Sequence, residues 1–384
     1  MNKNNRTNVN EMLLYLDILA YFHEFSHGGY HRAGEFLKEY FEKPLNERPV
    51  TMFNCFRSDK DSGVVSLLEF LCSDEKICNL KIAADSSGDE RFSSVCLTDD
   101  ILDEDDKILS RNIYFILGGN YRTGEYFSNG KMVSTWSDNL LGAVQCVTEE
   151  QKNILLFYDK ALKTAMNDKD LSDTAKITVT VSGHSKAGNL AQFICLFRKS
   201  VNRCVTYEAE GFSKRFVRKY KNIITDRGRY VTNICPDMSL TGDLLESLPS
   251  SKRKFIRTGY MCNAKSEINP LCYHIPMSVL DKDYHLLKEA GEQCVLSKWV
   301  GYTVELIIRT ISSCPLIDEE SALESLGKSV LYFFKGRKRR AFEFLSNKYT
   351  LFLIPTALAC IIFSIPLIFI LFAEKLYDRL YKIK

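Results

Sequence analysis

Hydrophobic residues in the first third of the chain recur at helical spacing and then give way to short apolar runs. Over residues 9–41, the stretches MLLYLDILAYF and FLKEYF place apolar side chains every third or fourth position, which predicts helices interrupted at Gly28-Gly29. The same spacing predicts a helix over 64–71. The acidic stretch 99–106 predicts a solvated loop, whereas NIYFIL at 112–117 is typical of a short buried strand.

From residue 148 onward, strand-like and helix-like patterns alternate. A chain that alternates in this way forms a mostly parallel sheet with helices on both faces, so the sequence predicts an α/β fold. The predicted helices cover 148–165, 189–199 and 214–220, and the predicted strands cover 176–181, 203–207, 229–234 and 254–257.

The C-terminal region differs in kind, because residues 351–373 contain no charged residue. This length matches the roughly 20 apolar residues that cross a bilayer, and no polar face is present. Pro355 and Pro366 are compatible with a membrane helix. The segment therefore predicts a transmembrane helix, with a re-entrant hairpin as the alternative. Basic residues before it, such as those in 335–340, outnumber those after it, which predicts that the large domain preceding it is cytoplasmic.

These patterns divide the chain into five parts. We expect an N-terminal helical region (1–75), an α/β core (76–284), a helical and basic juxtamembrane region (285–348), a transmembrane segment (349–373) and a short tail (374–384).

Composition narrows the function classes. With 45% hydrophobic and 26% charged residues, the chain is a folded globular protein. No basic footprint for nucleic acid is evident. The 13 cysteines are scattered and never form CxxC, which argues against a disulfide scaffold or a zinc knuckle and favours buried, reduced thiols. The N-terminus lacks the pattern of a signal peptide.

The motif that carries chemistry is VTVSGHSKAGNLAQF, in which a β-branched strand leads through Ser185 into a helix. A nucleophile elbow holds its serine on a sharp, strained turn and needs small residues two positions to either side, here Gly183 and Ala187. The helix N-terminus that follows favours an oxyanion, and the N–H of Lys186 is one expected donor. A serine in a plain tight turn is the alternative interpretation. A phosphate-binding loop is excluded because the second half of its motif is missing.

A serine nucleophile needs a histidine base, and the chain has six histidines. His184 adjoins the serine, and its side chain is expected to diverge at the turn. His23, His27 and His31 have the spacing of a metal face, but Gly28-Gly29 predicts a helix end among them. His274 and His285 lie downstream of Ser185, where a hydrolase base belongs. We predict His274 as the base, because it lies in a loop after the last strand.

The acid of the triad is expected after an intervening strand. Asp237 follows the strand at 229–234 and is the predicted acid, with Asp243 and Glu208 as alternatives; helix capping is the other role open to the two aspartates. Gly119 and Asn120 follow an early strand and are predicted to supply the second oxyanion donor, because glycine allows close backbone approach.

These motifs resemble a family. GHSKAGNLA closely resembles the GHSKGGNLA signature of the bacterial Mbeg-like family, which is similar to the class 3 lipases of the α/β-hydrolase superfamily. Three segments depart from the family pattern: LGGN replaces FRGT, EAEGF replaces DGPGF, and Ala187 replaces a glycine. In the related lipases the acid aligns nearer Ser239 than Asp237. Further matches are Arg91-Phe92, FILGGNYRT (115–123), WSDN (136–139), EAEGF (208–212), PDMSLTGDLL (236–245) and Cys272–His274.

The resemblance implies an α/β-hydrolase fold and ester hydrolysis. The sequence therefore predicts a membrane-anchored serine hydrolase that cleaves carboxylic esters, lipid esters among them, through Ser185, His274 and Asp237. No metal or organic cofactor is expected. The alternative is a catalytically inactive scaffold of the same fold that binds a partner at the membrane. Acyl transfer to an acceptor other than water would use the same residues.

Overall fold

The computed structural model of the 384-residue chain describes residues 8–49, 63–87, 93–118, 142, 145–239, 242, 245–258, 271–295, 297–299, 301–303 and 306. The predicted transmembrane segment (349–373) and tail (374–384) lie outside the described residues, as do Gly119, Asn120 and Asp243. Within the described ranges, none of the helices has the length and apolar character that spanning a bilayer requires.

Seven strands form one sheet within the described part of the chain, and their order in space follows their order in sequence. The first two pairings are antiparallel, and every pairing from β3 onward is parallel. The predicted α/β class and its mostly parallel sheet are thus confirmed. The strands are β1 (Lys81–Asp85), β2 (Ser93–Leu102), β3 (Ile108–Gly118), β4 (Leu171–His184), β5 (Arg203–Tyr207), β6 (Val231–Pro236) and β7 (Lys252–Ile256).

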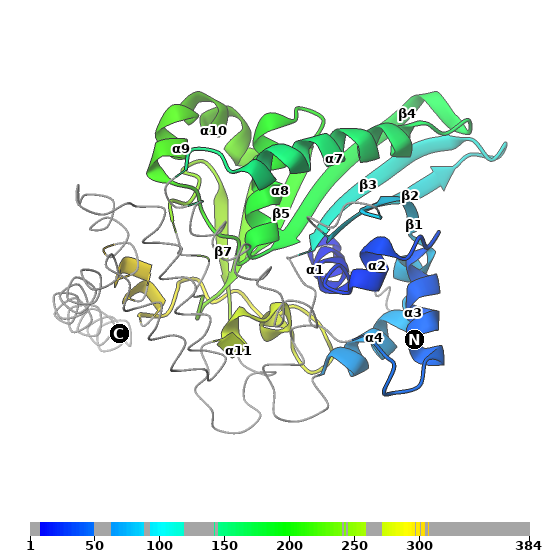
Figure 1. Ribbon diagram of the computed structural model, residues 1–384, viewed down its shortest axis with the longest axis horizontal. Helices are drawn as coiled ribbons and strands as arrows, with labels where there is room; N and C mark the ends of the chain where they lie inside the picture. Colours follow the sequence, from blue (N-terminus) through cyan, green and yellow to red (C-terminus); the bar gives the residue numbers. More distant parts are fainter. Residues whose placement is uncertain are drawn as a thin grey trace, which may run out of the picture.

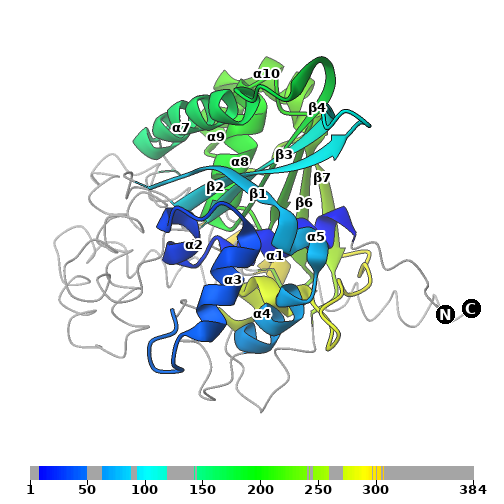
Figure 2. The same cartoon turned by 90° about the vertical axis from the view of Figure 1, so that its right-hand side faces the viewer.

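Helices cover both faces of this sheet (Figures 1 and 2). One face carries α7 (Glu149–Met166), α8 (Lys186–Phe197), α9 (Lys214–Lys219) and α10 (Lys221–Arg227), followed by the 3₁₀ turn η2 (Gly228–Tyr230). The other face carries α1 (Val9–Leu19), α2 (His23–His27), α3 (Ala33–Glu42), α4 (Val64–Cys72), α5 (Glu75–Asn79), α11 (Leu271–His274) and η3 (Pro276–Val279).

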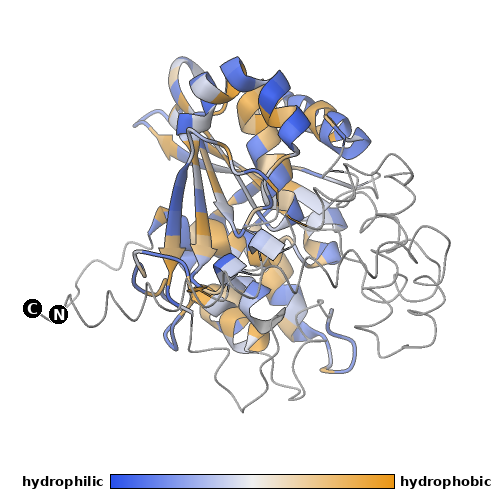
Figure 3. Cartoon of the chain, turned by 90° about the vertical axis from the view of Figure 1, so that its left-hand side faces the viewer, coloured by the Kyte–Doolittle hydropathy of each residue, from blue (hydrophilic) through white to orange (hydrophobic). Residues whose placement is uncertain are grey.

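Strand alternation divides the core into two layers. Because successive strand residues point to opposite faces, Tyr114 and Ile116 of β3 pack with α1, while Ile113, Phe115 and Leu117 pack with α7 and α8. Apolar residues lie where the helices meet the sheet, and polar residues cover the outer sides of the helices above it (Figure 3).

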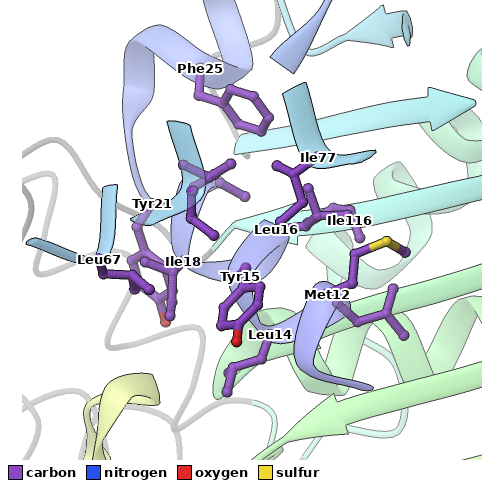
Figure 4. Packing of buried hydrophobic residues seen from close by; sticks show 14 of the residues in the cluster. Met12, Leu14, Tyr15, Leu16, Ile18, Tyr21, Phe25, Leu67, Ile77 and Ile116 are labelled. Atoms are coloured by element: carbon purple, nitrogen blue, oxygen red, sulfur yellow. The ribbon is translucent and has the colours of Figure 1, made fainter. Parts of the chain in front are cut away.

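The helix α1 lies at the centre of the lower helical layer, which consists of the helices on the face of the sheet that carries α1 to α5. Its residues from Met12 to Leu19 are all buried, and Figure 4 shows Tyr15, Leu16 and Ile18 packed among side chains of neighbouring elements. A capping box of Asn8 and Glu11 satisfies its first backbone N–H groups. The N-terminal helical residues therefore form one face of the α/β core.

Some predicted elements differ from the structure. The loop predicted over 99–106 is wrong for its first four residues, because β2 runs to Leu102 and the Asp100 carboxylate is buried in an ion pair with Arg111. The helix predicted over 189–199 begins at Lys186, directly after the turn. The helical pattern predicted from His285 is wrong over 285–292, which makes isolated bridges at Leu286 and Glu289.

Candidate active site

Ser185 lies in a strained turn between β4 and α8. Its backbone has φ 58° and ψ −125°, in a region that residues other than glycine rarely adopt. Its N–H donates to the carbonyl of Tyr207 at 2.9 Å, and its carbonyl accepts from the N–H of Asn189 at 3.2 Å. The bend therefore begins on a hydrogen bond to the neighbouring strand β5 and ends in the first turn of α8. This strand–turn–helix geometry is that of a nucleophile elbow.

The small residues around the turn are required by close backbone packing. A Cβ on Gly183 would lie 2.6 Å from the carbonyl oxygen of Ala187, and a Cβ on Gly188 would lie 2.5 Å from the Cβ of Ala209. Ala187 itself is buried and its methyl group is accommodated. Gly183 and Gly188 therefore both leave no room for a side chain, and Gly188 is where α8 approaches the chain after β5.

His274 and Glu208 form a hydrogen-bonded pair next to this turn. The Nδ1 atom of His274 lies 2.9 Å from Oε2 of Glu208, whose side chain is only 2% exposed. Glu208 directly follows β5, and it too has a positive φ, of 47°. The ring of His274 lies 4.8 Å from the ring of His184, the residue before Ser185. Two adjacent parallel strands are therefore each followed by a residue of positive φ, and His274 contacts the carboxylate of one, Glu208, and the neighbour of the other, His184.

The predicted acid, Asp237, is directed elsewhere. Its Oδ1 accepts hydrogen bonds from the N–H and the hydroxyl of Thr258, just after β7. The carboxylate that meets His274 is Glu208, which sequence reasoning kept only as an alternative. Glu208 is one strand closer to the nucleophile, and the bend at its positive φ turns the side chain inward, a feature that no local sequence pattern reveals.

A hydrogen-bonded support holds Glu208. The hydroxyl of Ser239, which is fully buried, donates to Oε1 of Glu208 at 3.1 Å. Ser239 Oγ accepts from the N–H of Gly242 at 3.1 Å, and its carbonyl accepts from Ser297. Both carboxylate oxygens of Glu208 are therefore engaged, one by His274 and one by Ser239.

The chain at and just after α1 fixes the other side of the turn. The hydroxyl of Ser182 donates to Asp17 at 2.8 Å, and burial raises the pKa of that carboxyl well above its usual range. Tyr21 hydrogen-bonds Nδ1 of His184. The last residues of β4 are thereby attached to the lower helical layer.

The charges around His274 raise the pKa of its imidazole. Burial alone would lower its pKa, but the charge and hydrogen bond of Glu208, with the charge of Glu210, raise it above the ordinary 6.5. His184 differs, because burial and the charge of His274 lower its pKa well below that value, opposed only by the backbone of His274. We therefore expect His274 to be the ring that gains and loses a proton.

The oxyanion donors are only partly within the described residues. Lys186 is the first residue of α8, so its N–H belongs to the helix turn that has no intrahelical acceptors. Its ammonium group lies 3.3 Å from Glu150, on the α7 side of the turn. Gly119 and Asn120 remain predictions, because they lie outside the described residues.

The remaining predicted histidines have other surroundings. His23 and His27 stack with ring centroids 4.0 Å apart, and His285 lies 3.7 Å from Glu11. Among the described residues, the group of side chains that could ligate a metal is His184, Glu208 and His274, whereas the sequence had predicted no metal site.

In comparisons with known proteins, no protein-family model matches the chain, and no curated protein matches it.

Proposed function

We propose that the chain is a serine hydrolase of the α/β-hydrolase type, similar to the Mbeg-like family and the class 3 lipases. Ser185 is the nucleophile, His274 the base and Glu208 the acid. The observation that carries the proposal is the His274–Glu208 pair beside the strained turn at Ser185. A scaffold that had lost catalysis would have no reason to keep a buried carboxylate on this histidine, since burying an ion costs free energy.

The mechanism follows from these positions. His274 accepts the proton of the Ser185 hydroxyl as the oxygen attacks an ester carbonyl, and then gives that proton to the departing alcohol. Glu208 accepts from Nδ1–H, which directs Nε2 toward the serine and stabilises the imidazolium. The N–H of Lys186 stabilises the oxyanion at the start of α8. Water then attacks the acyl group on Ser185. His274 accepts the proton of that water and returns it to the oxygen of Ser185 as the acid product leaves.

The substrate class is a carboxylic ester, and the C-terminal apolar segment extends the proposal to lipid esters. A helix crossing the membrane at 349–373 would hold the catalytic domain next to acyl lipids on the cytoplasmic side. This part of the proposal rests on the sequence alone.

A fluorophosphonate probe tests the nucleophile, because it reacts covalently with activated serines. The full chain in detergent micelles should be labelled at Ser185, as located by peptide mass spectrometry. Ser185→Ala should abolish labelling. Ser200→Ala is the matched control, because this exposed residue, whose hydroxyl bonds Tyr158 at 2.8 Å, lies just beyond the far end of α8 and should not affect the label. A cooperatively folded protein that is not labelled, or a Ser185→Ala variant that still is, would refute the proposal.

A further inference from the structure

His184 adds a third ligating side chain to the pair of Glu208 and His274 that the proposed triad uses. One nitrogen or carboxylate oxygen from each residue lies within 4.8 Å of the others. The three residues come from the end of β4, the end of β5 and α11, so the fold itself assembles them. Two imidazoles and one carboxylate are a ligand set that zinc prefers, and three protein ligands leave a fourth position for water.

His184 is the residue that the proposed mechanism does not use. Its ring is buried, and its Nε2 makes no hydrogen bond of standard geometry, although the backbone of His274 influences its protonation. A buried polar atom without a hydrogen bond destabilises the fold, so a ligand for this nitrogen would offset that cost.

Tyr21 prepares His184 for such a role. It hydrogen-bonds Nδ1, and when Nδ1 is the donor, Nε2 carries a bare lone pair. A histidine that ligates a metal characteristically donates its other N–H to a neighbouring group, which fixes the tautomer and the ring orientation. The Tyr21 hydroxyl is in the position to accept that hydrogen bond.

We propose that a divalent transition-metal ion of the zinc type binds His184, Glu208 and His274, and that the bound ion inhibits the hydrolase. This inference rests on the proposed function. Binding replaces the hydrogen bond between His274 Nδ1 and Glu208 with two metal–ligand bonds, and the ring proton moves through water from Nδ1 to Nε2, which then has no lone pair for the proton of Ser185. The metal-bound imidazole then has neither its acid nor its orientation, so it no longer accepts the proton of Ser185. The active and metal-bound arrangements exclude one another.

The geometry sets a condition on this site. A tetrahedral zinc ion, about 2.0–2.1 Å from each nitrogen, requires ligand atoms about 3.3 Å apart. The cluster must therefore contract from its separation of up to 4.8 Å, while His274 and Glu208, at 2.9 Å, are already close. We expect His184 to move farther than the other two ligands. Its hydrogen bond with Tyr21 should therefore determine the affinity for the metal ion.

Direct metal titration of the chelator-treated full chain in micelles tests the site. Cobalt(II) reports the ligand geometry through its visible absorption, and calorimetry with zinc gives stoichiometry and affinity. We expect one ion per chain, a parallel loss of fluorophosphonate labelling, and recovery of labelling on adding chelator. Tyr21→Phe should weaken zinc binding by about 10–100-fold, because it removes the group that fixes His184, and His184→Gln should weaken it further.

His27→Gln is the matched control, because His27 belongs to the other close histidine pair and should leave both affinity and labelling unchanged. Binding that persists unaltered in both His184→Gln and Tyr21→Phe would overturn the site, and Tyr21→Phe decides alone if His184→Gln does not fold. Zinc that binds without slowing the labelling would overturn the inhibition. If no labelling occurs even without metal, the hydrolase proposal fails, but the titration still supports or refutes the ion site.

Discussion

Two buried charge clusters lie at opposite ends of the sheet, and they are built on different principles. At the amino end of the parallel strands, Arg111 of β3 binds Asp100 through two hydrogen bonds of 2.6 and 2.9 Å. It also donates to Asp168 at 2.6 Å and to the carbonyl of Ala165 at 2.5 Å. This cluster joins β2, β3 and the end of α7. Its geometry is bidentate and its charges are compensated, as expected of a structural link.

The cluster around His274 lies at the carboxyl end and is incompletely satisfied. Ser185 and Glu208 have positive φ, and Nε2 of His184 lacks a hydrogen bond of standard geometry. Strain and unmet hydrogen bonding persist only where the surrounding fold compensates for them, and they concentrate at functional sites. The contrast suggests that Arg111 stabilises the fold, whereas the His274 cluster lowers stability in exchange for reactivity.

Glu208→Gln should lower activity more than a change at Arg111 or Asp237, and it should destabilise the fold less than a change at Arg111. Gln keeps the shape and can still accept from Ser239, but it no longer stabilises the imidazolium, so labelling and ester hydrolysis should fall by about 10³–10⁴-fold. The base must be neutral to act, so wild-type activity should rise with pH through a midpoint above 6.5, the side to which Glu208 shifts the pKa of His274. Glu208→Gln removes that influence, and the midpoint should move to lower pH.

The measurement is the pH dependence of the fluorophosphonate labelling rate. Glu210→Gln is the matched control, because it removes a neighbouring buried charge without touching the hydrogen bond, and it should cause a smaller shift in the same direction. A residual activity close to that of the wild type in Glu208→Gln would show that the carboxylate is structural, and the comparison between the two clusters would break.

Arg111→Met should have the opposite effects: a large loss of stability and a small change in activity. Removing the guanidinium leaves the carboxylate of Asp100, which is 5% exposed, buried without its partner. Breaking such a pair costs about 3–5 kcal/mol of unfolding free energy. Urea denaturation measures that loss, and the double variant with Asp100→Asn should recover part of it. The labelling rate per folded molecule should stay within about tenfold of the wild type. A larger fall in that rate would mean that the distant cluster also shapes the active site.

The sequence predicted the elements whose patterns are local. The β-branched run before Ser185 and the periodic apolar residues of α7 identify a strand and a helix, because burial of a face imposes those periods. The elbow was recognisable for the same reason: its small residues and its serine lie within one turn.

The antiparallel edge of the sheet was harder to predict, because its decisive contact is not local. Asp99 and Asp100 belong to an acidic stretch that reads as a loop, and only the pairing of β2 with β3 brings Asp100 to Arg111. The proposed acid, Glu208, was ranked below Asp237 for a related reason. Glu208 and Asp237 each follow a strand, and the choice between them depends on backbone bends and on Thr258, twenty-one residues from Asp237.

Asp237→Asn is therefore the smallest and most discriminating change. Asn retains an oxygen that accepts from Thr258, so we expect a loss of about 1 kcal/mol or less in unfolding free energy, the typical net value of one hydrogen bond. Activity should change by less than about tenfold, because the side chain bonds at the end of β7 and not to His274. Denaturation and labelling of this variant beside Glu208→Gln compare two acids, each at or just after the end of a neighbouring strand. If Asp237→Asn loses activity as severely as Glu208→Gln, the acid has been assigned to the wrong strand, because only the carboxylate that stabilises the imidazolium should matter so much.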